Sequence, residues 1–255
     1  MNPILQHVRD LATKGKRLDA RKLDEYRDIS VETGVVKTAE GSARVKLGKT
    51  EVLIGIKLSV GTPYPDTPNE GALMVGAELM PMSNPEFESG PPSIESIELA
   101  RVIDRGIRES HAINQEKLCI TPGEKVWMVS VDICTINADG NLFDAAGIAT
   151  LAALKDTKFP KYDGETVDYK ELTKDPLVID QAPLPVTISK INEQLFVDLA
   201  ENEEGAEDGR ITATILEDGT VCSLQKGGPV PFSSEELGKV IDLAVEKSKE
   251  IRAKL

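Results

Sequence analysis

The sequence has few aromatic residues, only two histidines and no long apolar run. Phe, Trp and Tyr together make up 4% of the 255 residues. No apolar run reaches the roughly 18 residues that a membrane-spanning helix requires, and no charged-then-apolar segment typical of a secretory signal follows Met1. We therefore expect a cytoplasmic protein with no membrane partner, folded as one large domain or two smaller ones.

Cysteine is also scarce. The three cysteines, Cys119, Cys134 and Cys222, are odd in number and far apart, which fits neither a disulfide framework nor a metal site. We expect them to be small buried apolar side chains. Neither His7 nor His111 has a serine, a cysteine or a second histidine at a useful spacing. The sequence therefore predicts no bound metal, no cofactor and no catalytic histidine.

Positive charge is in the minority and unevenly distributed. The net charge of −13 argues against a free-standing nucleic-acid binder. However, residues 1–60 contain 12 Lys and Arg against 8 Asp and Glu, whereas residues 131–255 contain 13 against 24. A basic N-terminal part on an acidic body indicates a molecule that faces an anion on one side, or equally one that binds an acidic protein.

The clearest structural signal lies between Lys125 and Asp156. Residues 126–136 are a nearly continuous run of apolar β-formers, which predicts a buried central strand. A turn follows at residues 137–140, where glycine can adopt a positive φ angle. The next residues are rich in alanine and predict a helix that packs closely against the sheet, with Asp144 as its N-cap.

Helical and strand patterns alternate along the rest of the chain and predict an α+β fold in which mixed β-sheets pack with helices. The expected elements of the first half are a helix from Asn2 to Thr13, hairpins between Ile29 and Val60, a strand at 71–80, and a helix that is capped by Ser93 and runs to about Ala112. They are followed by a polar linker at 158–176, paired strands at 186–191 and 194–199, a hairpin at 210–225, and a last helix opened by a capping box of Ser233 and Glu236.

Residues 43–50 end in Gly48-Lys49-Thr50 and match a relaxed nucleotide-binding P-loop pattern. A P-loop requires a glycine-rich loop that leads into a helix, whose amides bind phosphate. Here the residues before Gly48 alternate as in a strand, and β-branched and apolar residues follow Thr50. We therefore interpret Gly48-Lys49 as a hairpin turn, and a nucleotide-driven switch is the less favoured alternative.

The expected helix at residues 93–112 contains a stripe of three arginines. Arg101, Arg105 and Arg108 follow the spacing i, i+4, i+7, so they lie within an arc of about 60° opposite the apolar face. The spacing alone favours a solvated face bridged to acids such as Glu98 and Asp104. A nucleic-acid interface is the alternative.

Several of these patterns coincide with those of a known family. The strand, the Asp139-Gly140 turn and the alanine-rich helix resemble the RNase PH family of phosphorolytic 3′-to-5′ exoribonucleases, as does the run from Gly41 to Val52, which fits Gly-x-Ala-x-Val-x-x-Gly-x-Thr-x-Val. The resemblance covers essentially the whole chain. It implies an RNase PH-like fold with a larger N-terminal domain at residues 1–157, a linker at 158–176 and a smaller C-terminal domain at 177–255.

The resemblance extends to an arginine-rich entry segment at residues 18–27. Taken alone, Arg17, Arg21 and Arg27 are expected on a solvated turn. In the family such arginines lie at subunit interfaces or on the side that faces RNA.

In active members of the family, the turn before the helix continues as Gly-Gly-Thr-Arg, which binds inorganic phosphate. The corresponding residues here are Asn141, Leu142, Phe143 and Asp144. Leu142 and Phe143 have no side-chain hydrogen-bond donor, no arginine follows, and Asp144 would repel a phosphate dianion. The resemblance therefore implies a degenerate phosphate site.

Active members also carry a catalytic aspartate, with a magnesium ion, on a loop equivalent to the acidic run at residues 197–208. Asp208 falls near that position as the remnant of an acidic site, and Glu207 competes for the same position. Without a positively charged phosphate cradle, an isolated aspartate has no nucleophile to organise. We therefore expect no catalytic residue in this chain.

Residues 97–105, 122–127, 139–146 and 197–204 make the match more specific, because together they resemble the non-catalytic RNase PH-like subunit of the archaeal RNA exosome. That resemblance implies a ring of three such subunits alternating with three catalytic RNase PH-like partners, RNA-binding cap subunits and single-stranded RNA. It implies that the chain helps to build the partner's active site and contacts RNA through Arg101, Arg105 and Arg108. A self-sufficient phosphorolytic 3′-to-5′ exoribonuclease is the alternative.

Overall fold

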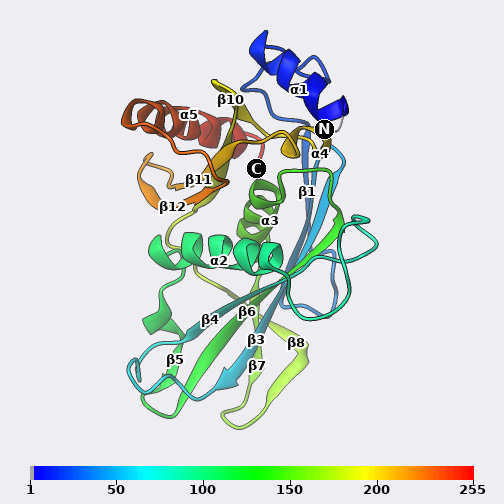
Figure 1. Cartoon of the computed structure of the whole chain (residues 1–255). Coiled ribbons are helices and arrows are strands. Elements are labelled where there is room, and N and C mark those ends of the chain that lie inside the picture. Colours follow the sequence, from blue (N-terminus) through cyan, green and yellow to red (C-terminus); the bar gives the residue numbers. More distant parts are fainter. Residues whose placement is uncertain (1–2) are drawn as a thin grey trace.

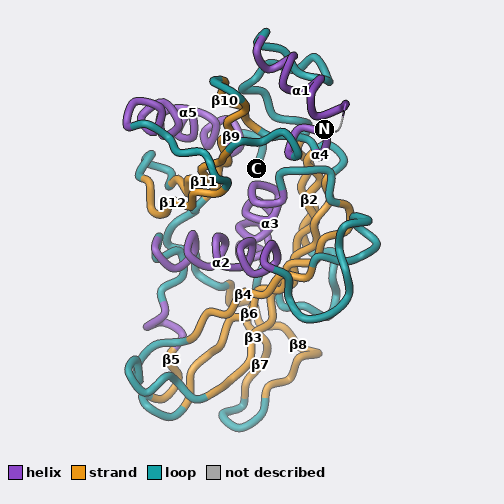
Figure 2. The backbone as a smooth tube through the Cα atoms, in the orientation of Figure 1, coloured by secondary structure: helices purple, strands orange, loops and turns teal. Residues whose placement is uncertain are grey.

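The computed structural model describes residues 3–255, so the expected helix start at Asn2 lies outside the described residues. The chain forms a layered α+β fold, as predicted: a large sheet, a pair of helices, a second sheet and a last helix (Figure 1, Figure 2). Among residues 3–255, no helix is both long and apolar enough to span a bilayer.

The large sheet has the strand order β1-β2-β3-β6-β4, and β5 also pairs with β6. Its neighbours are antiparallel except β4 and β6, which are parallel. Its strands are β1 (Ile29–Thr33), β2 (Gly41–Leu47), β3 (Thr50–Gly61), β4 (Ala72–Glu78), β5 (Cys119–Thr121) and β6 (Lys125–Asn137). Strands β2 and β3 form the predicted hairpin, with Gly48 at a φ of 58° in the turn, so Thr50 begins a strand and not the helix of a P-loop.

Two helices cover one face of this sheet. Helix α2 (Ile94–Glu109) is capped by Ser93, whose side chain accepts a hydrogen bond from the Ser96 amide at 3.2 Å, as predicted. Helix α3 (Leu142–Asp156) lies between the two sheets and is mostly buried. Its small residues permit this close packing, since a Cβ on Gly147 would lie 2.0 Å from Pro185 of the second sheet.

The second sheet has the order β10-β9-β11-β12 and is entirely antiparallel. Its strands are β9 (Leu184–Ile191), β10 (Gln194–Val197), β11 (Gly209–Ile215) and β12 (Val221–Gly227). Helix α5 (Ser234–Arg252) begins at the predicted capping box and packs on β9 and β11. Every residue of β9 is buried because the strand lies between α3 and α5. Helix α1 (Pro3–Thr13) contacts the short helix α4 (Glu201–Glu204) at one end of the molecule.

Three expectations about burial and segment type are wrong. The segment expected as a linker forms an antiparallel hairpin, β7 (Lys158–Tyr162) and β8 (Val167–Pro176). It packs against β6, where Trp127 contacts the Phe159 and Tyr162 rings at centroid distances of 5.3 and 5.8 Å. Strand β6 is central, but its burial alternates because only one face is fully covered by the helices. The three cysteines are free and half-buried.

Asp198, in the loop after β10, is fully buried at the centre of an ion cluster. Its carboxylate accepts hydrogen bonds from Arg27 Nη2 at 2.7 Å, Arg27 Nε at 2.9 Å and Arg21 Nη1 at 3.0 Å. It also accepts a bond from the Asn141 side-chain amide at 3.0 Å. The cluster therefore connects the N-terminal segment, the start of α3 and the C-terminal sheet.

Arg17 extends the same cluster. Its side chain is fully buried, forms an ion pair with the buried Glu203 and donates to the backbone oxygens of Val197 and Asp198 at 2.8 and 2.7 Å. Arg17, Arg21 and Arg27 were expected on a solvated turn, and that expectation is wrong. Their guanidinium groups are buried because Asp198, Glu203 and several carbonyl oxygens together satisfy their donors.

Replacing Asp198 by alanine should destabilise the protein strongly, because the mostly buried Arg21 and Arg27 would lose a common anion. Removal of one partner from a buried ion pair typically costs about 3–5 kcal/mol. Urea unfolding measures the change. The control is Asp19→Ala, which removes a half-exposed partner of Arg21 (41% side-chain exposure), and should cost less than about 1 kcal/mol. Equal losses in the two variants would contradict a central role for Asp198.

Candidate functional site

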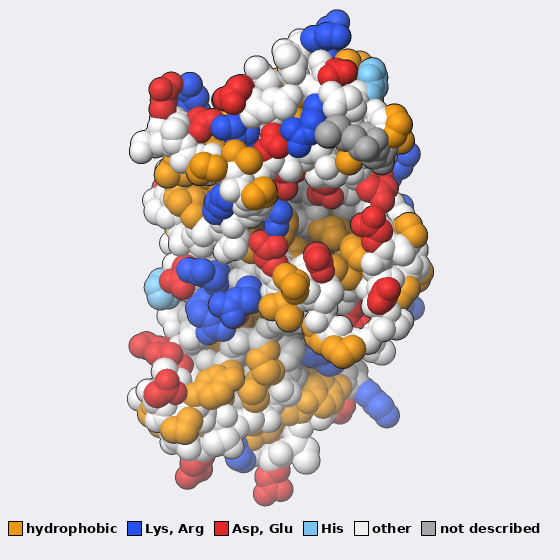
Figure 3. Space-filling model, in the orientation of Figure 1, with side chains coloured by type: hydrophobic (Ala, Val, Ile, Leu, Met, Phe, Trp, Pro, Cys, Tyr) orange, Lys and Arg blue, Asp and Glu red, His pale blue; other side chains and the backbone are white. Residues whose placement is uncertain are grey.

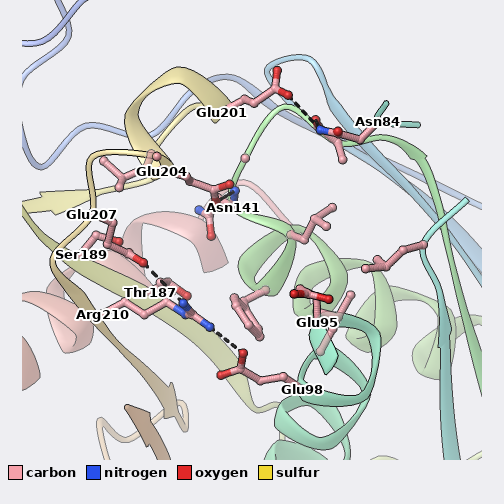
Figure 4. Close-up of a pocket in the computed structure, with 18 of the residues that line it drawn as sticks. Asn84, Glu95, Glu98, Asn141, Thr187, Ser189, Glu201, Glu204, Glu207 and Arg210 are labelled. Carbon is pink, nitrogen blue, oxygen red and sulfur yellow. Dashed lines mark hydrogen bonds and ion pairs between the residues drawn. The ribbon is translucent and has the colours of Figure 1, made fainter. Parts of the chain in front are cut away.

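A cavity of about 420 Å³ lies where the N-terminal ends of α2 and α3 meet the loop that follows β10. Figure 4 shows its lining residues, and Figure 3 shows acidic side chains around a hollow on this face of the molecule. Asn141, Leu142 and Phe143, three residues of the predicted degenerate phosphate site, line the cavity, and the fourth, Asp144, does not. The structure therefore brings most of that site together.

Asn141 is the residue that begins α3. It adopts a left-handed backbone conformation with φ of 54° and is the N-cap, so the prediction that Asp144 caps the helix is wrong. Its backbone amide donates a 2.7 Å hydrogen bond to the Glu204 carboxylate. The N-terminal end of a helix favours an anion. In this chain, a carboxylate of the same chain occupies that position.

Asp144 is fully buried beneath the start of α3. Its carboxylate accepts hydrogen bonds from the Tyr26 hydroxyl at 2.6 Å, the Thr187 hydroxyl at 2.8 Å and the Asn141 side-chain amide at 3.0 Å. Burial raises the pKa of Asp144 to about 6, and these hydrogen bonds partly offset the rise. Asp144 therefore holds the helix start in place and does not face a ligand in the cavity.

Arg210, on β11, is the one Lys or Arg among the described residues that line the cavity. Its guanidinium lies over the Phe143 ring at 4.9 Å from the centroid. It pairs with Glu98 at 2.7 Å and with Glu207 at 3.4 Å. The only cation of the lining is therefore compensated by two carboxylates.

Acidic side chains outnumber basic ones in the lining. The carboxylates are those of Glu86, Glu95, Glu98, Asp198, Glu201, Glu204 and Glu207. Desolvation raises the pKa of the Glu204 carboxyl to about 7. The residue as a whole is exposed to solvent, and water there screens its charge. A phosphate dianion entering this cavity would meet net repulsion.

The structure also separates the two candidates for the remnant acidic position. Glu207 lines the cavity, as Figure 4 shows. The Asp208 carboxylate forms an ion pair with Arg9 of α1 at 2.7 Å and accepts a 2.7 Å bond from the Asn192 amide. The two side chains thus point to different sides of the bend that precedes β11. The Asp208 carboxylate therefore binds α1, whereas the Glu207 side chain faces the cavity.

The arginine stripe lies outside the cavity on the exposed side of α2, where Figure 3 shows basic side chains gathered. Arg108 pairs with Asp104 at 2.8 Å and donates to the Leu73 carbonyl oxygen at 3.2 Å. Within residues 3–255, the side chains of Arg101 and Arg105 form no ion pair or hydrogen bond. Two of the three predicted RNA-binding arginines are thus available to an external anion.

Sequence reasoning missed several residues of this site. Arg210, Glu98 and Glu95 come from separate elements and reach the cavity only through the tertiary fold. The loop between β4 and α2 contributes Asn84, which donates a 2.9 Å bond to Glu201 across the cavity mouth. Only the density of acids at residues 201–208 was a local signal.

The raised pKa of Asp144 predicts how the free energy of unfolding changes with pH. The pKa of the folded state, about 6, is above the ordinary value of 3.8, so between these pH values the folded state binds more protons than the unfolded state. The contribution of this group to stability is therefore lost as pH rises through that window, by up to about 3 kcal/mol.

The variant Asp144→Asn should lose this pH dependence. An asparagine can accept from Tyr26 and Asn141 through its oxygen and donate to the Thr187 hydroxyl. Relative to the original protein, the variant should gain stability progressively in urea unfolding as pH rises from about 4 to about 6, the window between the two pKa values. Asp242→Asn, at an exposed position, is the control and should show no such trend. If the difference in unfolding free energy between Asp144→Asn and the original protein does not change with pH, the raised pKa assigned to Asp144 is contradicted.

Comparisons with known proteins agree with this geometry. The model described as "3' exoribonuclease family, domain 1" matches residues 25–160, and the model of domain 2 matches residues 181–247. Proteins named "Exosome complex component Rrp42" are similar along almost the whole chain. The protein from Methanopyrus kandleri is 48% identical over 240 residues, which is 93% of this chain and 90% of that protein. The protein from Thermococcus onnurineus is 47% identical over 252 residues, which is 98% of this chain and 93% of that protein.

Solved structures give the same result. A chain of the "archaeoglobus fulgidus exosome with RNA bound to the active site" superimposes with a TM-score of 0.92 at 40% identity, covering 98% of this chain and 97% of that chain. A chain of an "Archaeal exosome core" gives a TM-score of 0.86 at 37% identity, covering 98% and 95%. The chain therefore belongs to the 3′ exoribonuclease family and has the RNase PH-like fold that its sequence predicted.

Proposed function

We propose that this chain is a non-catalytic subunit of an exosome, a ring that degrades RNA from its 3′ end. The relatives named as exosome components and the exosome structures support the assembly. The observation that carries the non-catalytic role is the 2.7 Å bond from the Asn141 amide to the Glu204 carboxylate. In a phosphorolytic site, the helix start must be open to inorganic phosphate.

The chemistry of phosphorolysis requires cations around the attacking phosphate, because that phosphate must approach an anionic RNA chain. Here Arg210 is held between Glu98 and Glu207, and Leu142 and Phe143 offer no donor. Each missing charge-assisted hydrogen bond weakens binding by about 1.5–3 kcal/mol. Several such losses, added to the repulsion by the carboxylates, make phosphate binding negligible.

In this proposal the chain contributes structure and RNA contacts. Its partners are a catalytic RNase PH-like subunit, alternating with it in a ring of three pairs, and RNA-binding cap subunits, all in the cytoplasm. The unpaired Arg101 and Arg105 and the neighbouring Arg108 hold the phosphates of a single strand near the partner's active site. The exposure of all three arginines on one side of α2 supports this role.

The isolated chain should release no nucleoside diphosphate from RNA and inorganic phosphate, because its cavity cannot hold the phosphate. Chromatography of the products with radiolabelled RNA measures this. The variants Glu207→Gln and Asp208→Asn serve to identify the source of any activity. Turnover by the pure chain that disappears in either variant would favour the alternative, a self-sufficient phosphorolytic exoribonuclease.

Replacing Arg101 and Arg105 by alanine together should weaken RNA retention by the assembled ring. Each phosphate contact to a single strand contributes about −0.7 to the slope of log K against log salt. Loss of two contacts should flatten that slope by about 1.4. Titration of labelled RNA at several salt concentrations measures the slope.

Lys249→Ala with Lys254→Ala is the matched control, since it removes the same charge at exposed positions near the end of α5. It should leave the salt slope unchanged. If the two double variants behave alike, the arginines belong to a solvated face and not to an RNA contact.

A further inference from the structure

The free edge of strand β4 carries almost no protecting charge. Strand β4 ends the large sheet and pairs with β6, and its other edge pairs with no strand of the described residues. Folded proteins protect such an edge with charged side chains or cover it, because its unpaired backbone groups attract another strand. Five of the ten residues of the exposed strand β8 are charged, whereas β4 has one charged residue, Glu78, at its end. Gly76 in β4 is exposed, which leaves its backbone accessible. The edge of β4 is therefore open to an added strand.

A groove of about 500 Å³ lies between this edge and α2. Its apolar lining includes Val75, Ala77, Pro92, Ile97, Ala100 and Ile133. On α2, Ile97 is 48% exposed, and Ile94, one turn earlier, is 81% exposed. Figure 3 shows hydrophobic side chains over the region of β4, next to the basic side chains of α2. Exposed apolar side chains that gather on one face of a folded protein mark an interaction surface.

Charged side chains of both signs also line the groove, namely Glu78 of β4, Asp132 of β6 and Arg101 of α2. In the part of the chain that the structure describes, none of these three side chains forms an ion pair. Glu78 and Asp132 would repel RNA phosphates inside the groove. An apolar centre with a polar rim is the composition of a protein interface. The open strand edge and the unpaired charges of both signs therefore fit an extended protein segment, which would pair through its backbone and complement these charges.

We propose that this groove binds an extended segment of the catalytic RNase PH-like subunit, which adds a strand to the edge of β4. This inference rests on the proposed function, because it names the surface by which the chain joins that partner. The place of Arg101 favours this occupant over a cap subunit. Arg101 lines the groove and belongs to the arginine stripe, so a subunit seated here lies beside the side chains that hold the RNA strand in the proposed function.

The variant Gly76→Lys with Ile97→Lys tests the groove. Lysine on an edge strand is a residue that natural sheets use to prevent pairing, and a charge at position 97 would be buried by the docked segment. A Cβ at position 76 has Asp132 Oδ1 at 3.9 Å as its nearest neighbour, and both positions are exposed, so the variant should fold. Urea unfolding verifies this.

The measurement is native mass spectrometry of a dilution series of the full chain with the RNase PH-like chain of the same organism that keeps the Gly-Gly-Thr-Arg turn. The groove variant should require at least about tenfold higher concentration to assemble, as for changes at the centre of an interface. The matched control, Leu172→Lys with Gly238→Lys, adds the same charges at exposed positions outside the groove. It should change that concentration less than about twofold, as for ordinary surface changes.

Hydrogen exchange of the original protein gives a readout that needs no variant, because assembly should slow the exchange of amides in residues 74–78. The inference alone is overturned if the original chain assembles and the groove variant assembles equally well, if the control loses as much, or if those amides exchange at the same rate in the assembly. A dimer of the original chain alone that the groove variant abolishes, with assembly unchanged, would assign the groove to a second copy. If the original chain does not assemble with that subunit at all, the proposed function fails together with this inference.

Discussion

The buried carboxylate of Asp198 is the interaction on which the candidate site depends. It joins Arg21 and Arg27 of the N-terminal segment to the Asn141 side chain at the start of α3. Both Asp198 and Asn141 have left-handed backbone conformations, with φ of 53° and 54°, which costs energy for residues other than glycine. Such conformations persist where the surroundings fix them. The same ion cluster therefore orients both walls of the cavity.

The fold of the 3′ exoribonuclease family is retained here, and the start of α3 is bound by a carboxylate of the same chain. A helix start needs an anion to satisfy its free amides, and Glu204 supplies one from within the chain. Arg210 is the cation that remains, and Glu98 and Glu207 hold it against Phe143. Internal groups therefore satisfy this helix start without a bound anion.

Local patterns in the sequence predicted the helices and strands, but they did not predict the polar contacts between residues far apart in the chain. The strand–turn–helix at residues 125–156, the β2–β3 hairpin and the caps at Ser93 and Ser233 all depend on neighbouring residues. Arg17 was expected in solvent and is buried because Glu203, 186 positions later, pairs with it. No periodic pattern in the sequence indicates a partner at such a distance along the chain. The choice between Glu207 and Asp208 likewise required the side-chain directions that only the folded chain provides.

Charge along α2 explains how an acidic cavity and a basic stripe can coexist. Glu95 and Glu98, which line the cavity, lie in the first turns of the helix, where the helix dipole favours acids. Arg101, Arg105 and Arg108 lie farther along it, together with Asp104 and Glu109. Glu98 and Arg105 are seven residues apart, about 10 Å along the axis, and this exceeds the Debye length of about 8 Å at physiological salt. Arg101 lies closer to Glu98, and Arg108 is paired with Asp104. Of the two unpaired arginines, Arg105 is therefore the one farther from the cavity acids, with Glu109 one turn beyond it, and in the proposed role it is a candidate for an RNA phosphate contact.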